Sequence, residues 1–404
     1  MKTHEIIRLG LHCDGIAEGP LYALRSLPGE IVEGVLEGNK LTNVKIVRPS
    51  SDRVAPLCPH YTACGGCQIQ HASDAFVAQW KSDLIKTALS AQGIETDIRP
   101  IATSPGASRR RATFSARRTK KGAMAGFHRQ ASDVIVEIPK CQLLMPELMS
   151  ALASAEDLAR IAASRKGELS IAVTHSGAGP DMSVTGGKPL DGPLRKALSD
   201  LAGKHDIARL CYEDDVIVTR RLPSQLFDDI VVYPPPNAFL QATKDAEKRL
   251  QLEVQALVGD ATHIVDLFAG CGTFSLPLAK KGRVLAFEGD SDMANCLEQA
   301  WRMTKGLKEV TTQTRDLFRN PLMSDEFSKA EAVVIDPPRA GAVAQTRELA
   351  LSGVPTIAYV SCNPTSFARD AKCLLDAGYH LDWVLPIDQF RWSAHVELVA
   401  AFRL

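Results

Sequence analysis

Three cysteines lie within ten residues, at Cys58, Cys64 and Cys67 in CPHYTACGGC, and Cys141 follows much later in EIPKCQLL. The two glycines between Cys64 and Cys67 let the backbone wrap tightly, so both thiols can reach one centre. Four thiolates suit either zinc or an iron-sulfur cluster, and the spacing leaves both open. Zinc motifs more often contain two CxxC pairs, so three grouped cysteines and a distant one favour a cluster. The sequence predicts a metal centre here in preference to four free buried thiols.

A glycine-rich turn follows an apolar run in IVDLFAGCGTFSLPLA, residues 264–279. The turn lacks the GxGxxG spacing with which NAD-binding proteins hold a pyrophosphate. It would instead let a neutral or cationic nucleoside lie against the backbone, and Glu288, at the end of the next apolar run, can accept hydrogen bonds from both ribose hydroxyls. We interpret the pair as a site for S-adenosylmethionine. A generic strand-helix-strand unit with an acidic strand end is the alternative.

A third set of reactive residues is spread over the last apolar runs, in VVIDPPRAG at Asp336, AYVSCNP at Cys362 and AHVELV at Glu397. Each residue closes a strand candidate or lies beside one. A cysteine at a strand end can act as a nucleophile if its thiolate is favoured. An inert core thiol is the commoner fate of any single cysteine, but the neighbouring motifs favour the catalytic interpretation.

The elements that must position these residues follow from the pattern after Gln225. Four apolar runs, HIVDLFAG, RVLAFEG, AEAVVIDPP and TIAYVSC, each end in Gly, Asp, Pro or Cys, and helical stretches such as 244–257 and 365–377 lie between them. This alternation predicts a doubly wound parallel sheet, an α/β fold, over residues 226–404. Ligands bind at the carboxyl ends of the strands in such sheets, where the reactive residues occur.

The first part of the chain has a different texture. From residue 5 to about residue 48, short apolar runs alternate with Gly, Pro and Asn, which predicts a small β-barrel within residues 1–52. A middle part, residues 53–225, contains the clustered cysteines and a helical stretch near 75–92.

A basic segment lies in this middle part, where eight Lys or Arg and no acid occur between Arg109 and Arg129, with Phe114, Phe127 and His128 interleaved. Such a segment can bind the phosphates of a nucleic acid. A solvated hairpin that happens to be basic is the alternative, although the nearby cysteine at position 141 favours a binding surface.

Bulk composition sets wider bounds. The 404 residues are 45% hydrophobic and 23% charged, which is typical of a folded chain of two or three domains. Lys plus Arg and Asp plus Glu are both 47, so net charge neither requires nor excludes a nucleic-acid partner. The opening MKTHEIIRLG does not resemble a signal peptide, and no apolar run is long enough to span a bilayer. We therefore expect a cytoplasmic protein without a membrane partner, whose ten cysteines are not paired as disulfides.

Taken together, these motifs resemble those of the RNA uracil-C5 methyltransferase family, and closely its branch that methylates 23S ribosomal RNA. The resemblance covers almost the whole chain. It includes FLQATKDAE with Gln241, DLFAGCGTFSL, the DPPR tetrad, SCNP and the terminal HVELV. The DGIAEG turn and the PGE triplet of the N-terminal part resemble the TRAM domain, and the cysteine spacing resembles the branch that carries a 4Fe-4S cluster. Departures are Ala269, where many relatives carry Cys, and Ala242 and Thr243 after the glutamine.

The resemblance implies roles for individual residues. Cys362 would be the nucleophile that adds to carbon 6 of a flipped-out uracil, and Glu397 the base that removes the proton from carbon 5. It also implies the partners: RNA, with 23S ribosomal RNA preferred and transfer RNA as the alternative, bound by a monomer. The cluster ligands would be the four cysteines above. The cofactor contacts would be Gln241, Phe268, Thr273, Glu288, Asp316 and Asp336.

Other functions fit less well. Cytosine-C5 methyltransferases usually carry a Pro-Cys nucleophile where this chain has Pro337 and Pro338, and adenine-N6 enzymes prefer an aromatic residue where it has Arg339. A non-catalytic iron-sulfur protein that binds RNA is an alternative from another class. It would have no physical reason to keep both Cys362 and Glu397.

Overall fold

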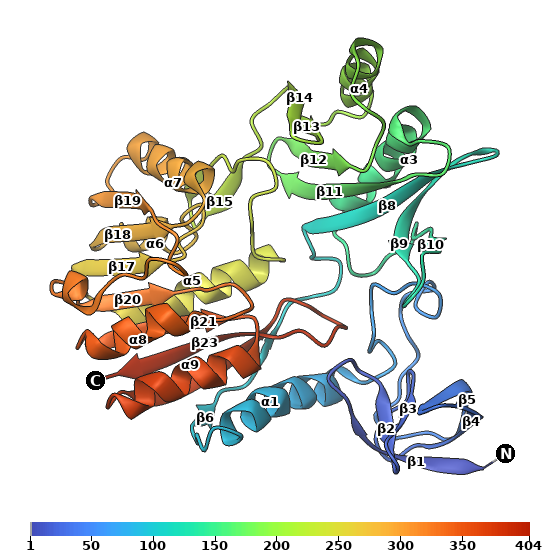
Figure 1. Cartoon of the computed structure of the whole chain (residues 1–404), viewed down its shortest axis with the longest axis horizontal. Coiled ribbons are helices and arrows are strands. Elements are labelled where there is room, and N and C mark those ends of the chain that lie inside the picture. Colours follow the sequence, from blue (N-terminus) through green and yellow to red (C-terminus); the bar gives the residue numbers. More distant parts are fainter. Residues whose placement is uncertain (1) are drawn as a thin grey trace.

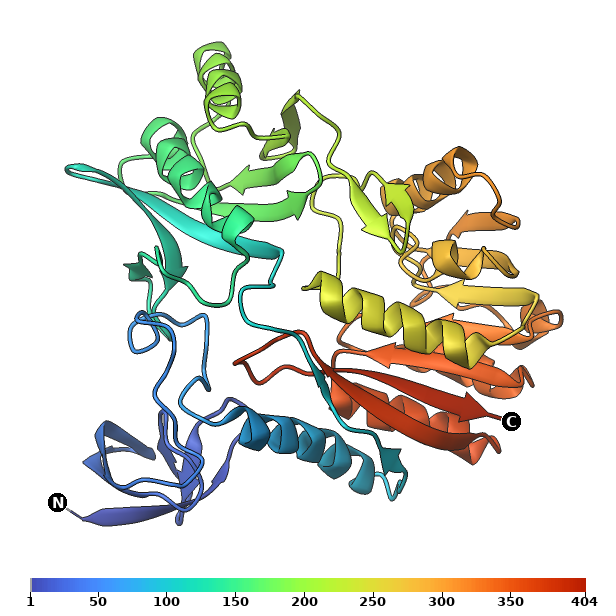
Figure 2. The same cartoon turned by 180° about the vertical axis from the view of Figure 1, so that it is seen from behind.

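The structure is a computed structural model that describes residues 2–404, and it has three parts (Figure 1). A small barrel lies at the N-terminus, a sheet with helices on one face follows, and a larger sheet with helices on both faces ends the chain. Helix α1 (Asp74–Ser90) extends from the barrel to the larger sheet, as both views show (Figures 1 and 2). Within residues 2–404, no helix combines the length and the apolar character needed to cross a membrane.

Five short strands close into the N-terminal barrel in the order β1-β2-β3-β5-β4, which confirms the predicted small barrel. Its buried Glu30 accepts a hydrogen bond from the backbone N–H of Leu27 at 2.8 Å and pairs with Arg53 in the following segment. This ion pair ties the barrel to the rest of the chain. The strands are β1 (Thr3–Leu9), β2 (Gly15–Ala17), β3 (Leu21–Ala23), β4 (Ile31–Glu37) and β5 (Lys40–Arg48).

The cysteine segment, residues 49–73, contains no helix or strand and leads into α1. Ser73 caps α1 by accepting a hydrogen bond from the backbone N–H of Phe76. The chain then forms β6 (Asp97–Ile98) and β7 (Ala102–Thr103), which both pair with a strand of the larger sheet. Part of the predicted middle range, 53–225, therefore packs with the C-terminal sheet, because α1 buries its apolar face there.

The middle sheet has seven strands in the order β10-β9-β8-β11-β12-β13-β14. Helices α3 and α4 pack together on one of its faces, and alternating residues of β8 and β11 point into that core. The elements are β8 (Arg111–Thr119), β9 (Gly122–His128), β10 (Ile135–Val136), α2 (Pro146–Met149), α3 (Ala151–Ala162), β11 (Glu168–Ser176), β12 (Gly179–Thr185), α4 (Gly192–Lys204), β13 (Arg209–Tyr212) and β14 (Asp215–Thr219). A separate hairpin, β15 (Gln225–Phe227) and β16 (Ile230–Val232), leads out of it.

The C-terminal sheet has nine strands, in the order β19-β18-β17-β20-β21-β23-β22-β6 with β7 also paired to β22. Its two faces are covered by separate apolar cores, one formed with α5, α6 and α7 and the other with α1, α8 and α9. Strands β17 to β21 are parallel, whereas β23 runs antiparallel between β21 and β22. The elements are α5 (Lys244–Val258), β17 (His263–Leu267), α6 (Ser275–Leu278), β18 (Arg283–Glu288), α7 (Ser291–Met303), β19 (Val310–Thr314), the short 3-10 helix η1 (Ser324–Phe327), β20 (Ala332–Ile335), α8 (Val343–Leu351), β21 (Thr356–Ser361), α9 (Pro364–Asp376), β22 (His380–Asp388) and β23 (Glu397–Arg403).

The predicted α/β sheet is confirmed, because the four apolar runs are β17, β18, β20 and β21 and the two predicted helices are α5 and α9. These strands are buried on both faces, so they appear in the sequence as continuous apolar runs. Strands β6, β7, β19 and β22 of this sheet were not predicted from the sequence.

Candidate active site

The reactive residues of the C-terminal part meet at one edge of the nine-stranded sheet. Leu267 pairs with both Phe287 and Ile335, so the residues that end or follow β17, β18 and β20 lie side by side. Since β23 is antiparallel to β21, its first residue, Glu397, comes to the same edge as Cys362, which follows the last residue of β21. The sheet topology therefore brings the nucleophile and base candidates together from distant positions in the sequence.

A cavity of about 390 Å³ lies at this edge. Its wall includes the proposed nucleophile and base and five of the six predicted cofactor residues. The lining residues are Phe239, Gln241, Phe268, Ala269, Gly270, Thr273, Phe274, Glu288, Met293, Asp336, Pro337, Pro338, Arg339, Cys362 and Glu397.

Asp316 is the predicted cofactor residue that does not line this cavity. It lies exposed in the loop after β19, where its Oδ1 accepts a hydrogen bond from the backbone N–H of Phe318 at 3.0 Å. The side chain of Asp316 thus stabilises its own turn, and its contact with the cofactor stays a prediction.

The glycine-rich turn between β17 and α6 needs its unusual residues. Phe268 and Gly270 both have positive φ values, 63° and 57°, and Gly272 has a φ of 94°. A side chain at position 272 would also collide with Leu297 of α7. The turn therefore brings bare backbone against the cavity, as a nucleoside site requires.

Glu288 is held by this turn. Its Oε2 accepts a hydrogen bond from the backbone N–H of Gly270 at 2.7 Å, and its Oε1 accepts one from Asp290 at 2.9 Å. Each carboxylate oxygen keeps a second lone pair, so both can still accept a hydroxyl proton. The carboxylate is therefore already oriented for the two hydroxyls of a ribose.

The cavity raises the pKa of its acidic groups. Burial and the negative charge of Asp266 raise the pKa of Asp336 to about 7. Burial and the charge of Asp336 raise the pKa of Glu397 well above its usual range, while a hydrogen bond from Gln389 opposes this shift. Both carboxyl groups therefore stay protonated to a higher pH than ordinary acids do.

Cys362 is half-buried, and its pKa is raised to about 12 by burial and by the charges of Glu397 and Asp336, with Arg339 opposing. The free site therefore does not favour the thiolate, although the sequence analysis required a favoured thiolate for a nucleophile.

The two residues after Cys362 begin helix α9. The side chain of Asn363 caps α9 by accepting a hydrogen bond from the backbone N–H of Thr365 at 3.1 Å, and Pro364 is the first residue of the helix. The Asn-Pro pair thus fixes the backbone directly after the thiol.

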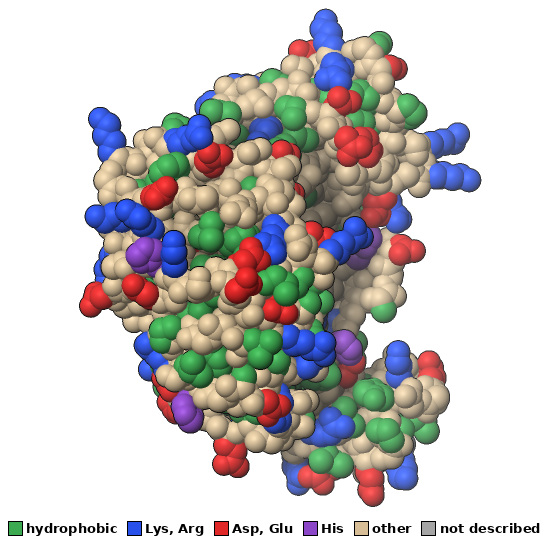
Figure 3. All heavy atoms as spheres, turned by 60° about the vertical axis from the view of Figure 1, so that its left-hand side comes forward, with side chains coloured by type: hydrophobic (Ala, Val, Ile, Leu, Met, Phe, Trp, Pro, Cys, Tyr) green, Lys and Arg blue, Asp and Glu red, His purple; other side chains and the backbone are tan. Residues whose placement is uncertain are grey.

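A second cavity, of about 550 Å³, meets the first at Cys362 and Arg339, which line both. Its other walls come from all three parts of the chain, including His12 of the barrel, Gln68 of the cysteine segment and Gln130 after β9. The thiol is therefore reached from two sides, one lined by the cofactor residues and the other by the barrel and the middle part. The outer surface near the large sheet mixes acidic and basic side chains (Figure 3).

The four clustered cysteines lie near one another. Burial, together with the charges of Cys141, Cys64 and Cys58, raises the pKa of Cys67 to about 12, and a hydrogen bond with Gln70 opposes this shift. Yet among residues 2–404, no three His, Cys, Asp or Glu side chains form a group arranged to hold a metal ion. The structure thus brings the predicted ligands into one region without assembling them as the ligands of a single ion.

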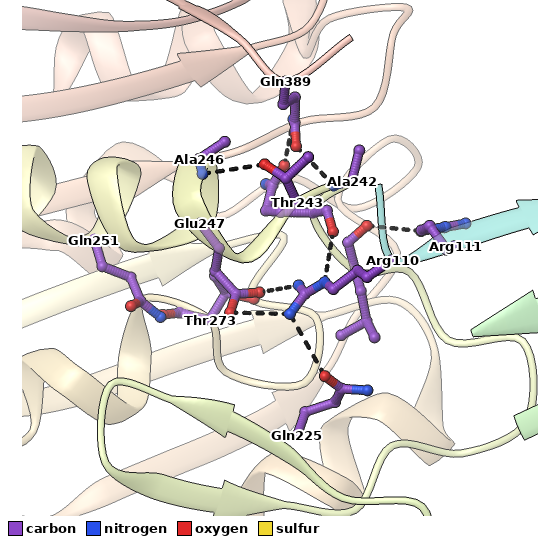
Figure 4. Close-up of polar contacts among 12 residues, drawn as sticks. Arg110, Arg111, Gln225, Ala242, Thr243, Ala246, Glu247, Gln251, Thr273 and Gln389 are labelled. Atoms are coloured by element: carbon purple, nitrogen blue, oxygen red, sulfur yellow. Dashed lines mark hydrogen bonds and ion pairs between the residues drawn. The ribbon is translucent and has the colours of Figure 1, made fainter. Parts of the chain in front are cut away.

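The basic segment forms the hairpin of β8 and β9, but its arginines have different surroundings. Arg118 and Arg129 are exposed, whereas Arg117 pairs with Glu168. Arg110 is fully buried and forms an ion pair with Glu247 of α5 (Figure 4). Arg110 therefore joins the middle sheet to the C-terminal part and cannot be part of a phosphate-binding surface.

Two residues of the site were missed in the sequence. Phe239 lines the first cavity while 60% exposed, and the guanidinium of Arg111 lies over its ring at 5.1 Å. Gln389 lies behind the cavity wall and bonds to both Gln241 and Glu397. The position of Phe239 two residues before Gln241 was a usable signal, whereas nothing near Gln389 in the sequence pointed to these contacts.

Comparison with known proteins agrees with this geometry. A family model described as tRNA (Uracil-5-)-methyltransferase matches residues 200–402. An uncharacterized RNA methyltransferase of Rhizobium meliloti (strain 1021) is 42% identical, with 98% of each chain covered. The 23S rRNA (uracil(1939)-C(5))-methyltransferase RlmD of Shewanella sp. (strain ANA-3) is 32% identical over 100% of this chain and 95% of its own length.

A solved structure shares the whole fold. The tRNA (uracil-54, C5)-methyltransferase of Pyrococcus abyssi, in complex with S-adenosyl-L-homocysteine, has a TM-score of 0.77, with 99% of each chain covered. Its sequence identity to this chain is 24%, so this similarity shows a common architecture.

Proposed function

The chain belongs to the RNA (uracil-5-)-methyltransferase family and is an S-adenosylmethionine-dependent enzyme, and from this premise we propose that it methylates a uridine of 23S ribosomal RNA. The observation that supports this target is the relative from Shewanella, which is similar over the full length of the chain, barrel and cysteine segment included. Those two parts also line the cavity on the far side of Cys362, where RNA has to approach.

The first cavity fits S-adenosylmethionine. The backbone of the glycine-rich turn leaves room for a nucleoside, and the carboxylate of Glu288 is oriented to accept both ribose hydroxyls. Phe268 and Thr273 complete the wall beside the turn. S-adenosylmethionine bound there would supply an electrophilic methyl group, and its sulfonium would leave as a neutral thioether.

Cys362 acts on the pyrimidine from the junction of the two cavities. Its thiol first releases its proton to solvent, and the sulfur then adds to carbon 6, so that the electrons of the carbon 5–carbon 6 double bond move toward O4 and carbon 5 becomes nucleophilic. Since the nearby charge of Asp336 raises the pKa of the thiol, protonation of Asp336, whose own pKa is raised to about 7, favours the thiolate. Because a stacked base cannot reach this buried sulfur, the target uridine flips out of its stack.

Glu397 completes the reaction once carbon 5 has received its methyl group. Its carboxylate removes the proton from carbon 5, the double bond reforms, and the bond between sulfur and carbon 6 breaks. Gln241 and Asp336 line the same cavity; the amide of Gln241 and the protonated carboxyl group of Asp336 donate hydrogen bonds to the polar edge of the uracil and stabilise the charge on O4.

The target is tested by mapping 5-methyluridine by mass spectrometry in ribosomal and transfer RNA from cells with and without the protein. Loss of one 5-methyluridine from 23S ribosomal RNA supports the proposal. Loss from transfer RNA alone would support the alternative target, transfer RNA, which the family description also names. The same mapping in cells that express Cys362→Ala separates the chemistry from any effect of the protein's presence.

We also propose that the four cysteines hold a 4Fe-4S cluster. The region fits sulfur ligands, because the backbone N–H of Gly66 lies 3.3 Å from the Sγ of Cys64, a contact that stabilises a thiolate. Gly65 is packed against the hairpin after β9, where its N–H donates to the carbonyl of His128 at 2.8 Å. Purification without oxygen should give a brown protein with iron and sulfide in equal amounts. A colourless protein that binds one zinc ion would contradict this proposal.

A further inference from the structure

Gln389 is a buried glutamine directly behind the wall of the first cavity. It follows the last residue of β22 and is 1% exposed. It comes from the loop that joins β22 to β23 and reaches the segment before α5, as Figure 4 shows. It does not line the cavity itself, but three hydrogen bonds connect it to residues at the site.

The orientation of this amide is fixed by a backbone group. The N–H of Ala242 lies 2.6 Å from Oε1 of Gln389, and a backbone N–H can only donate. Oε1 must therefore face Ala242, and Nε2 of Gln389 must face the other way. There it donates to Oε1 of Gln241 at 2.6 Å and to Oε2 of Glu397 at 2.7 Å.

The orientation of Gln389 determines that of Gln241. Because Oε1 of Gln241 accepts from Gln389, its Nε2 must face the cavity side, where it lies 3.4 Å from Oδ2 of Asp336. Gln241 therefore offers hydrogen-bond donors to a bound base and not an acceptor. A donor matches O4 of uracil, whereas cytosine carries an amino group at that position, so the fixed amide discriminates between the two bases.

Gln389 has a second effect on Glu397. Its N–H occupies one carboxylate oxygen, Oε2, and leaves the other for the substrate. The titratable groups that act on Glu397 are Asp336, whose charge raises the pKa of Glu397, and Cys362, whose own pKa Glu397 raises. Against these, the hydrogen bond from Gln389 favours the ionised form, which is the form that removes a proton.

The loop that carries Gln389 is fixed without any ligand. The preceding residue, Asp388, forms a buried ion pair with Lys81 of α1 at 2.5 Å, and Lys81 also donates to the carbonyl of Phe390 at 3.1 Å. Further along, the carbonyl of Trp392 accepts from the backbone N–H of Gln68 at 2.8 Å. Gln389 is thus held rigidly enough to orient its partners before a substrate arrives.

We propose that Gln389 is a positioning residue that orients two groups at once: it turns the amide of Gln241 so that its donors face the uracil, and it directs the carboxylate of Glu397 toward carbon 5. This inference rests on the roles proposed above for Glu397 and Gln241. It adds a residue that does not touch the substrate but determines both base selectivity and the last step of the reaction.

The test uses Gln389→Met, which keeps the length of the side chain and removes its hydrogen bonds. Single-turnover reactions with ribosomal RNA from cells that lack the protein, and S-adenosylmethionine labelled in its methyl group, measure how fast the methylated protein–RNA adduct breaks down. We expect breakdown to slow about 10- to 100-fold at neutral pH. Its pH profile should move to higher pH, because losing the hydrogen bond raises the pKa of Glu397.

A matched control is Gln345→Met. Gln345 is equally buried in the same part of the chain, where its amide bonds both the N–H and the carbonyl of Leu322, far from the cavity. This variant loses two buried hydrogen bonds where Gln389→Met loses three, so it should also lower thermal stability while leaving the pH profile unchanged. A wild-type pH profile and breakdown rate in Gln389→Met would overturn the proposal.

Gln389→Glu keeps the inference testable if the methionine variant folds poorly. Glutamate keeps the acceptor for Ala242 but has no N–H for Gln241 or Glu397, and it adds a negative charge beside Glu397. A positioning role predicts that Gln389→Glu is slower than Gln389→Met, whereas a merely structural role predicts the reverse. Failure of the wild type to form an adduct with 5-fluorouridine RNA would instead count against the proposed covalent mechanism.

Discussion

The catalytic edge of the large sheet and the cysteine segment are built in opposite ways. At the edge, five parallel strands and antiparallel β23 fix the backbone positions of the reactive residues, and buried hydrogen bonds orient Gln241, Glu288 and Glu397. The cysteine segment has no helix or strand, and its thiols do not form a group arranged around a single ion.

The difference shows what fixes the positions of the side chains at each site. Strand ends are placed by the whole sheet, so the catalytic groups are ordered before any ligand binds. The cysteine segment is held by hydrogen bonds of turns and by contacts with neighbouring loops, and a bound cluster would add further constraints. We therefore expect substitutions at the edge to change chemistry, and substitutions in the segment to change local order first.

The largest effect is expected for Cys362→Ala. Removing the sulfur prevents addition to carbon 6, so methylation should fall below detection and no adduct should form with 5-fluorouridine RNA. The assay is methyl transfer to RNA together with a denaturing gel that resolves the protein–RNA adduct. Cys373→Ala, on α9 and outside both cavities, is the matched control and should retain full activity. Full turnover by Cys362→Ala would contradict the covalent mechanism.

Glu397→Gln should have the next largest effect. The amide keeps the shape but cannot accept the proton from carbon 5, so the methylated adduct should form and persist, with product release slowed about 10²- to 10⁴-fold. In the wild type, protonation of Glu397 removes the base. Because its pKa is raised, product release should fall with decreasing pH at a higher pH than for an ordinary glutamate. Rapid product release by Glu397→Gln would exclude this residue as the base.

The Arg110–Glu247 ion pair, which connects the middle sheet to the C-terminal part, is tested by Arg110→Met. This change leaves Glu247 buried without its partner, which typically costs about 3–5 kcal/mol of unfolding free energy. The guanidinium of Arg110 also donates to the carbonyl of Gln241 at 3.0 Å, so the variant should bind substrate less well in addition. Thermal unfolding measures the first effect. Arg302→Met, which removes an exposed ion pair with Glu298 on α7, should cost only about 0.3–0.5 kcal/mol.

Much of the catalytic edge could be predicted from the sequence, because parallel strands buried on both faces leave continuous apolar runs and place motifs at their ends. Cys362, Glu288 and Asp336 were found in this way. The sequence did not show that Asp316 lies in a turn, TRDLF, in which its carboxylate accepts a hydrogen bond from the backbone N–H of Phe318. Gln389 could not be found, since its role depends on a neighbour that is 148 positions away in the chain.

The role of Arg110 in the basic segment could not be predicted for a related reason. Arg110 belongs to a run of basic residues that is hydrophilic in the sequence, and only the packing of α5 against the start of β8 reveals its buried partner. Strand pairing beyond the parallel core was equally hidden. The two-residue strands β6 and β7 are too short to give a periodic pattern, and they join the sheet because α1 delivers them to β22.

The smallest effect on chemistry is expected for Cys64→Ala in the cysteine segment. If the cysteines hold a cluster, this variant should lose iron, and hydrogen exchange should increase in residues 49–73 while the large sheet stays protected. Backbone hydrogen bonds, such as that from the N–H of Gln68 to the carbonyl of Trp392, join the segment to the loop between β22 and β23. Weakening such a bond should lower turnover about two- to tenfold. Cys211→Ala, in the middle sheet, should change neither iron content nor exchange in the segment. A Cys64→Ala protein with normal iron and exchange, yet as inactive as Cys362→Ala, would show that the segment takes part in the chemistry directly.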